Sequence, residues 1–119
     1  MLIMIHPLLS RIALFAFLFL MSCGDSPQSV AKNFTENLAK GRISEAKKYA
    51  TEPTGEMLDF ASKIGAMPVN PDFTFVYVEK NVDGDKATVV YRESVDGPDE
   101  RINLVRIDGE WKVHMQTPK

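Results

Sequence analysis

The only cysteine of the sequence, Cys23, is the residue whose type and position point most directly to chemistry. An uninterrupted apolar run over residues 12–21 ends just before it, and the polar residues Gly24-Asp25-Ser26 follow it. Because the sequence has no second cysteine, this thiol cannot form a disulfide inside the chain even in an oxidising compartment. Its expected chemistry is therefore modification, and packing alone must hold the fold.

The four residues Leu20-Met21-Ser22-Cys23 resemble the lipobox of bacterial lipoproteins, with a large aliphatic residue three positions before the cysteine and a small residue directly before it. The resemblance implies cleavage between Ser22 and Cys23, and attachment to Cys23 of several acyl chains such as palmitate, which together give lasting membrane attachment. The apolar run follows Arg11 and matches a secretory h-region of roughly 7–15 residues, whereas spanning a bilayer takes about 20. An uncleaved signal anchor with an incidental cysteine is the alternative.

The predicted organisation is a signal peptide over residues 1–22, a lipidated cysteine with a short tether over 23–25, and one domain over 26–119. Removing the leader leaves 97 of the 119 residues, which is enough for a single domain with a modest core. The formal net charge is -2, so no nucleic-acid partner is expected. The expected location is a bacterial cell envelope, on a membrane and leaflet that the sequence does not identify.

Helical periodicity dominates the first part of this domain. Ser26-Pro27 is a good helix start, because serine caps an exposed amide and proline at the first helical position loses only a hydrogen bond that was unavailable. We expect helices over about 27–40, 44–50 and 54–64, with Pro53 preventing the second from continuing. The first helix carries an apolar stripe made by Val30, Ala31, Phe34 and Leu38.

From residue 73 onward the apolar period changes to two, and β-branched and aromatic residues dominate. Four strands are expected, over residues 73–82, 87–95, 101–107 and 111–115. Short turn sequences separate them, so successive strands should pair antiparallel. Helices followed by a meander predict an α+β fold, with three N-terminal helices packed on a curved four-stranded antiparallel sheet.

Turn residues predict the register of both hairpins. A two-residue turn at Asp108-Gly109 pairs three residues of the third strand with three of the fourth on the core side: Arg106 with Trp111, Leu104 with Val113, and Ile102 with Met115. The other face then carries Lys112 and His114 toward water. A turn at Asp83-Gly84 makes both faces of the first hairpin apolar, with Val76, Val78, Val89 and Tyr91 on one side and Phe73, Phe75, Tyr77, Val90 and Arg92 on the other. The uncovered side is a candidate association surface.

The layout resembles small bacterial lipoproteins with the cone-shaped, nuclear transport factor 2-like (cystatin-like) fold. The resemblance covers essentially residues 26–116, and three stretches carry it: the helix start at 26–31, the turn Lys40-Gly41-Arg42-Ile43 with the following 45–51, and Gly109-Glu110-Trp111-Lys112-Val113 as a last strand. It implies a curved sheet wrapped around helices with a pocket between them. In the wider superfamily that pocket holds a steroid, a polyketide, a peptide or nothing, and many members have no assigned function.

Three residues are candidates for lining such a pocket. Arg106 opposite Trp111 predicts a cation-π contact on the helix-facing side, where the guanidinium could also bind an anionic ligand. The alternative is that Arg106 stacks on Trp111 for a purely structural reason. Tyr49, in the second expected helix, is the third candidate pocket residue.

No catalytic residue, metal ligand or cofactor site is predicted. Isomerase-like enzymes of the superfamily use an inward carboxylate kept reactive by an apolar pocket. The expected register instead places Glu79 near Thr88 at a sheet end, and Glu93 is interpreted as a charge on the rim. His114 has no second histidine in the mature chain with which to share a metal, so a solvent-side role is expected.

Three functions remain open at this point. The favoured one is a non-catalytic, membrane-anchored envelope lipoprotein that binds a small molecule, a peptide or another envelope protein. The alternatives are an isomerase- or dehydratase-like enzyme, which an inward carboxylate would favour, and a structural module that forms a homodimer through its sheet face.

Overall fold

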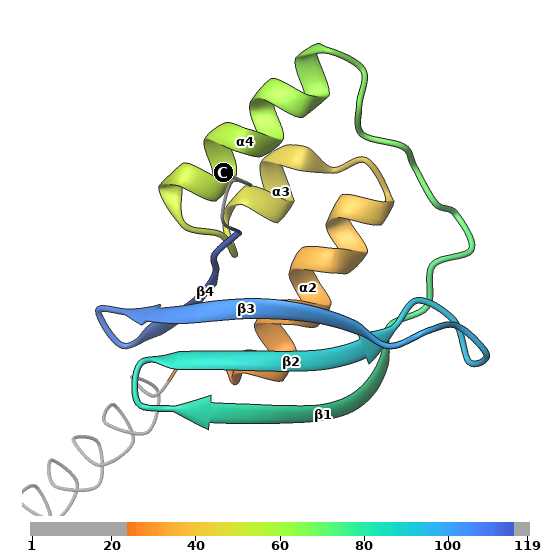
Figure 1. Ribbon diagram of the computed structural model, residues 1–119. Coiled ribbons are helices and arrows are strands. Elements are labelled where there is room, and N and C mark those ends of the chain that lie inside the picture. Colours follow the sequence, from red (N-terminus) through yellow and green to blue (C-terminus); the bar gives the residue numbers. More distant parts are fainter. Residues whose placement is uncertain (1–23, 116–119) are drawn as a thin grey trace, which may run out of the picture.

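Among the residues that the structure describes, three helices come first and four strands follow (Figure 1). The computed structural model describes residues 24–115. Within them the strands form one antiparallel sheet in the order β1-β2-β3-β4, so the predicted α+β class and the meander are confirmed. The elements are α2 Pro27–Ala39, α3 Ile43–Lys47, α4 Glu52–Lys63, β1 Val76–Asp83, β2 Lys86–Arg92, β3 Glu100–Ile107 and β4 Glu110–Val113. None of the described helices is long and apolar enough to span a membrane.

Helix α2 begins and ends where its local sequence predicts. Ser26 has an extended backbone and its Oγ accepts a hydrogen bond from the Ser29 amide at 3.1 Å, with Pro27 in the first turn. Gly41, just beyond the helix, has a φ of 76°, which glycine adopts without a steric penalty. The apolar stripe is buried at Val30, Ala31 and Phe34.

The second and third helices differ from expectation at their ends. Helix α3 stops at Lys47, a turn at Lys48 and Tyr49 follows, and Ala50 then forms an isolated parallel bridge with Val113 of β4. The Thr51 amide donates to the Val113 carbonyl at 2.9 Å, and the Val113 amide donates to the Tyr49 carbonyl at 2.8 Å. Helix α4 then begins at Glu52, earlier than predicted, because Pro53 fits its first turn. The segment between α3 and α4 therefore covers part of the free edge of β4.

The last hairpin has the predicted turn and most of the predicted register. Asp108 and Gly109 both have positive φ, 52° and 81°, as a type I′ turn requires. Arg106 pairs with Trp111 and Leu104 with Val113. The expected pairing of Ile102 with Met115 is wrong, because β4 ends at Val113 and the Met115 amide donates instead to Thr54 Oγ1 of helix α4 at 2.9 Å.

The predicted register of the first hairpin is wrong. Its turn is Gly84-Asp85, with Gly84 at a φ of 60° in the first central position, as in a type II′ turn. Glu79 is therefore paired with Val90, and Thr88 is paired with Asn81. A bulge between Tyr77 and Glu79 shifts the pairing again, so Tyr77 is opposite Tyr91.

This register also changes which aromatic residues are available for association. Phe75 stacks on Tyr91, with ring centroids 5.2 Å apart, although the two were predicted on opposite faces. Phe73 and Phe75 both pack against the core. Neither belongs to an uncovered sheet face, and the exposed apolar side chains on β1 are Tyr77, Val78 and Val82.

The core lies between helix α2 and the sheet. Buried side chains from α2 meet those of the strands in a single cluster, to which Ala46 and Leu58 contribute from α3 and α4. Helix α3 packs against α2, and α4 packs against α3, so α2 is the helix in closest contact with the sheet (Figure 1). Every described helix, strand and core residue lies within 27–113, so a chain that starts at residue 24 contains all the contacts of this core.

A buried chain of hydroxyl groups joins β4 to the start of α4. Thr51 Oγ1 donates to Thr54 Oγ1 at 2.9 Å and lies 2.9 Å from His114 Nδ1, and Thr54 Oγ1 also accepts from the Met115 amide. His114 is thus half-buried and hydrogen-bonded, which corrects its expected role as a simple solvent-side residue. The hydrogen bonds fix the end of the sheet against the helices.

We expect Thr54→Val to lower the free energy of unfolding by about 1–3 kcal/mol, because valine keeps the shape but leaves polar partners unpaired. Chemical denaturation of the chain starting at residue 24 measures this. Thr74→Val is the matched control, since Thr74 is exposed, and it should change stability by less than about 0.5 kcal/mol. Equal effects of the two variants would contradict a structural role for the Thr54 hydroxyl.

Candidate ligand-binding site

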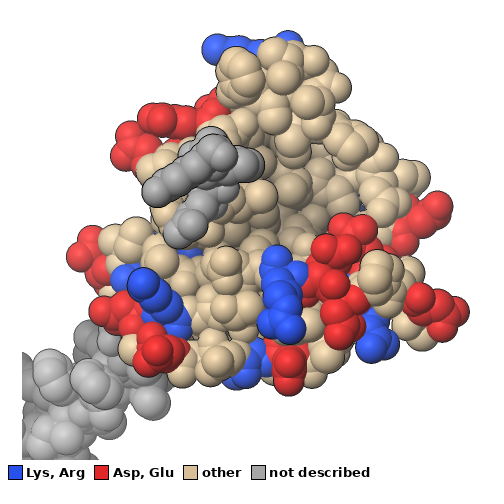
Figure 2. All heavy atoms as spheres, in the orientation of Figure 1, with Lys and Arg blue, Asp and Glu red and all other residues tan. Residues whose placement is uncertain are grey.

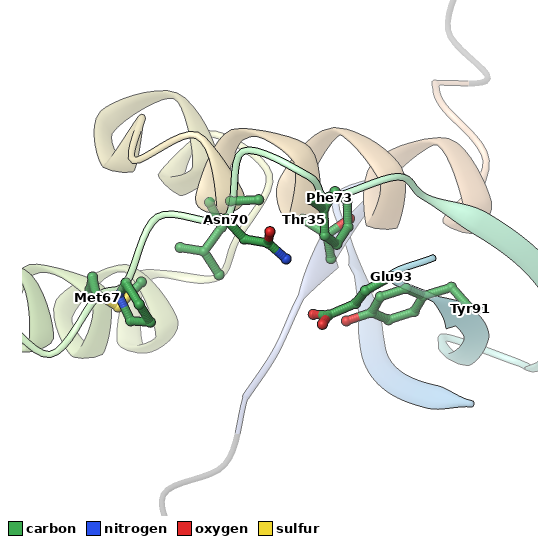
Figure 3. Close-up of a pocket in the computed structure, with 9 residues that line it drawn as sticks. Thr35, Met67, Asn70, Phe73, Tyr91 and Glu93 are labelled. Atoms are coloured by element: carbon green, nitrogen blue, oxygen red, sulfur yellow. The ribbon is translucent and has the colours of Figure 1, made fainter. Parts of the chain in front are cut away.

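A cavity of about 310 Å³ opens between the C-terminal half of α2, the connection from α4 to β1, and the end of β2 (Figure 3). Such a volume is at the lower end for small-molecule sites. Its lining consists of Thr35, Leu38, Ala39, Met67, Pro68, Asn70, Phe73, Tyr91 and Glu93. Most of these side chains are apolar, which leaves few groups to orient a ligand.

The walls of this cavity are mainly apolar because of how α2 and the connection meet. Leu38 and Ala39 come from the last turn of α2, and Met67 and Phe73 come from the connection and also pack against the core. The hydroxyl of Thr35 is hydrogen-bonded within α2, 2.8 Å from the Ala31 carbonyl oxygen, so α2 itself already uses it. The polar groups left to a ligand therefore belong to Asn70, Tyr91 and Glu93.

Asn70 is held in place by a turn. Its backbone amide donates to the Ala39 carbonyl at 2.8 Å, which ties the connection to the end of α2. Its Oδ1 accepts from the Asp72 amide at 3.1 Å, in the local turn that Asn followed by Pro favours. Figure 3 shows the remaining side-chain nitrogen pointing into the cavity. Asn70 therefore offers a neutral hydrogen-bond donor.

Tyr91 presents its hydroxyl at the cavity from strand β2. The ring is buried and stacked on Phe75, which fixes its orientation. Burial raises the pKa of the Tyr91 hydroxyl to about 12, with further contributions from the charges of Glu93 and Glu100. The phenol is thus protonated at neutral pH, and the folded state loses stability as pH rises from about 10 toward 12, where the folded protein must give up this proton.

Two carboxylates flank this phenol. Glu93 lies two residues after Tyr91, and Figure 3 shows its carboxylate beside the Tyr91 hydroxyl at the cavity. Glu100 lies opposite Tyr91 in the β2–β3 pairing and so shares its face of the sheet. The neighbouring Arg92 is paired with Asp99 at 2.8 Å. Figure 2 shows acidic side chains gathered beside the hollow between the helices and the sheet. The cavity mouth is therefore acidic.

The three pocket residues predicted from sequence lie away from this cavity. Tyr49 and Trp111 line a separate hollow of about 230 Å³, together with Gly24 and Asp25. Arg106 does not line it. Its guanidinium carbon lies 4.8 Å from the centre of the Trp111 ring, as predicted, and its Nε donates to Asp85 at 3.2 Å. The stacking interpretation of Arg106 fits these contacts, because Asp85 already neutralises its charge.

The remaining predicted residues are placed as follows. Glu79 is exposed and lines a hollow with Thr88, Val90 and Arg101, away from the cavity, whereas Glu93, predicted as a rim charge, is exposed but does line the cavity. Residues 24–115 contain no group of three His, Cys, Asp or Glu side chains arranged to hold a metal ion. Ser22 and Cys23, the predicted cleavage and lipidation residues, lie outside the described residues.

Comparisons with known proteins agree with this architecture. Residues 21–70 match a family described as a domain of unknown function, DUF4878. No curated protein matches the sequence significantly. A crystal structure of a Campylobacter jejuni protein, described as a candidate NTF2-like transpeptidase, aligns with a TM-score of 0.53 and 20% sequence identity, over 77% of this chain and 100% of the other. At this identity the likeness shows a shared fold, so the described domain has an NTF2-like fold.

Proposed function

We propose that this protein is a non-catalytic binding protein of the bacterial cell envelope, held on a membrane by lipid on Cys23. Its ligand occupies the cavity between α2, the α4–β1 connection and β2. The observation that carries the proposal is the convergence of three polar groups, from Asn70, Tyr91 and Glu93, on an otherwise largely apolar cavity. A small apolar surface with a few oriented polar groups is typical of ligand sites.

The position of the cavity relative to Gly24, the first described residue, supports a ligand that arrives from water. Gly24 lies against the Gly109 carbonyl in the β3–β4 turn, and α2 starts three residues later, at Pro27. The cavity lies at the other end of α2, which has 13 residues and is about 20 Å long. If the lipid holds Cys23 at the bilayer, the short tether keeps the first end of α2 close to it, and an upright α2 places the cavity about 20 Å further out.

We expect the chain starting at residue 24 to bind 2-phenylethanol in this cavity with a Kd of about 1–10 mM. Amide NMR spectra recorded during a titration measure both the affinity and the location. Ala39→Trp should abolish the shifts by filling the cavity, since Ala39 lines it. Ala66→Trp is the matched control, because Ala66 is exposed and outside the lining. Binding that survives Ala39→Trp, or no binding by the unmodified chain, would contradict the proposed site.

An enzymatic function is the second candidate, because one wall carries both a protonated phenol and a carboxylate. Tyr91 could donate a hydrogen bond to a substrate carbonyl while Glu93 removes a proton, as an isomerase or dehydratase requires. The exposure of Glu93 argues against it, since such a base works best in a dry, apolar environment. Turnover of a carbonyl substrate that disappears in Glu93→Gln, with binding retained, would favour the enzyme.

A further inference from the structure

We propose that the cavity selects an apolar ligand that carries a primary ammonium group, with the ammonium held at Glu93 and the apolar part between Leu38, Met67 and Phe73. This inference rests on the proposed binding function and adds the chemical class of the ligand. Its basis is the charge at the cavity mouth together with the donors already present in the wall.

The lining of the cavity carries negative charge and no positive charge. None of the nine lining residues is Lys, Arg or His, and Glu93 is the one charged residue among them. Within residues 24–115, neither Glu93 nor Glu100 forms an ion pair, whereas their neighbour Asp99 is paired with Arg92. Two carboxylates without an ion-pair partner among these residues therefore lie near Tyr91: Glu93 two residues further along the chain, and Glu100 opposite Tyr91 in β3. Their field attracts a cation and repels an anion.

The aromatic lining adds a second reason for a cation. Tyr91 and Phe73 both face the cavity, and the stack of Tyr91 on Phe75 holds its ring in place. A ring face attracts an ammonium group within about 6 Å of its centre. The apolar residues meanwhile suit the carbon skeleton of the ligand. A bare metal cation or a fully polar polyamine would leave that apolar surface unused.

The neutral donors suggest where a ligand oxygen lies. Asn70 uses its Oδ1 in the turn, so its side-chain nitrogen can donate to a ligand. The Tyr91 hydroxyl is a second donor at the cavity. A carbonyl or hydroxyl oxygen near the ammonium group could accept from them. An amino ketone, an amino alcohol or the first residue of a peptide with an apolar side chain has this combination of groups.

Three probes of similar shape test the charge preference: phenethylamine, 2-phenylethanol and 3-phenylpropanoate, titrated at neutral pH into the chain that starts at residue 24 and followed by amide NMR. We expect the amine to bind about three- to fivefold more tightly than the alcohol, as one exposed ion pair provides, and the carboxylate to bind more weakly than the alcohol. Glu93→Gln should reduce the ratio of amine affinity to alcohol affinity, both measured in the same variant, to about onefold. Glu79→Gln, which changes an exposed carboxylate outside the lining, is the control and should keep the preference.

The outcomes separate this inference from the proposed function. If 3-phenylpropanoate bound as tightly as phenethylamine or more tightly, the ammonium preference would be overturned. The cavity would still be a binding site. A preference for the amine that persists in Glu93→Gln would equally overturn the assignment of Glu93. Absence of shifts with all three probes would instead contradict the binding function itself.

Discussion

Cys23→Ser is expected to abolish incorporation of radioactive palmitate into the protein in growing bacterial cells, whereas the unmodified protein becomes labelled. A thiolate is a far better nucleophile than a serine hydroxyl at neutral pH, so serine leaves the lipid without an acceptor. The variant should also remain a longer precursor, because cleavage before residue 23 is expected to accompany lipidation. On the same sample, the radioactive label reports lipid attachment and the gel mobility reports cleavage.

Labelling is the informative measurement because fractionation alone is ambiguous. An uncleaved precursor keeps the apolar run over residues 12–21 and can stay with the membrane without any lipid. Ser22→Ala is the matched control: alanine is also small, so this variant should be labelled and cut like the unmodified protein. Label in the Cys23→Ser protein, or none in the unmodified one, would contradict lipid anchoring.

Local sequence signals predicted the elements of this fold well. The Ser26-Pro27 start and the Asp108-Gly109 turn act over a few residues, so their geometry follows from residue type and the structure agrees with both. The burial of Trp111 and its contact with Arg106 followed from that turn, because a hairpin turn sets the register of the whole pair.

The first hairpin shows where such signals become ambiguous. Asp83-Gly84-Asp85 can form a two-residue turn with glycine in either central position, and the two choices give different pairings. The structure adopts Gly84-Asp85 and adds a bulge near Val78, for which the sequence has no clear signal. The turn pairs Glu79 with Val90, and the turn and bulge together place Phe75 on the same side as Tyr91.

The cavity could not be predicted from sequence because a connection without regular structure forms one of its walls. The path of that connection depends on long-range hydrogen bonds, from the Asn70 amide to Ala39 and from the Thr74 amide to the Glu93 carbonyl. Residue patterns do not report such contacts. Two signals were present: the Asn70-Pro71 turn, and the alternation that places Tyr91 and Glu93 on one face of a strand.

Phe34→Ala is expected to lower the free energy of unfolding by about 3–5 kcal/mol, the cost of removing a large side chain from a close-packed core. Phe34 is 1% exposed, and it belongs to the cluster through which α2 meets the sheet. A domain of this size has a total stability of about 5–15 kcal/mol, so the variant should lose a large part of it. Denaturant unfolding of the chain that starts at residue 24, followed by circular dichroism, measures the loss.

The chain offers a matched control for this experiment in a second helix. Phe60 in α4 is 65% exposed, so Phe60→Ala removes the same atoms from a position that is already in water. Its effect should be within about 0.5 kcal/mol. A large loss of unfolding free energy in both variants would mean that the Phe60 face of α4 is also packed in solution. A small loss in both would mean that α2 does not hold the sheet through Phe34. Only a large difference between the two phenylalanines agrees with a core built between α2 and the strands.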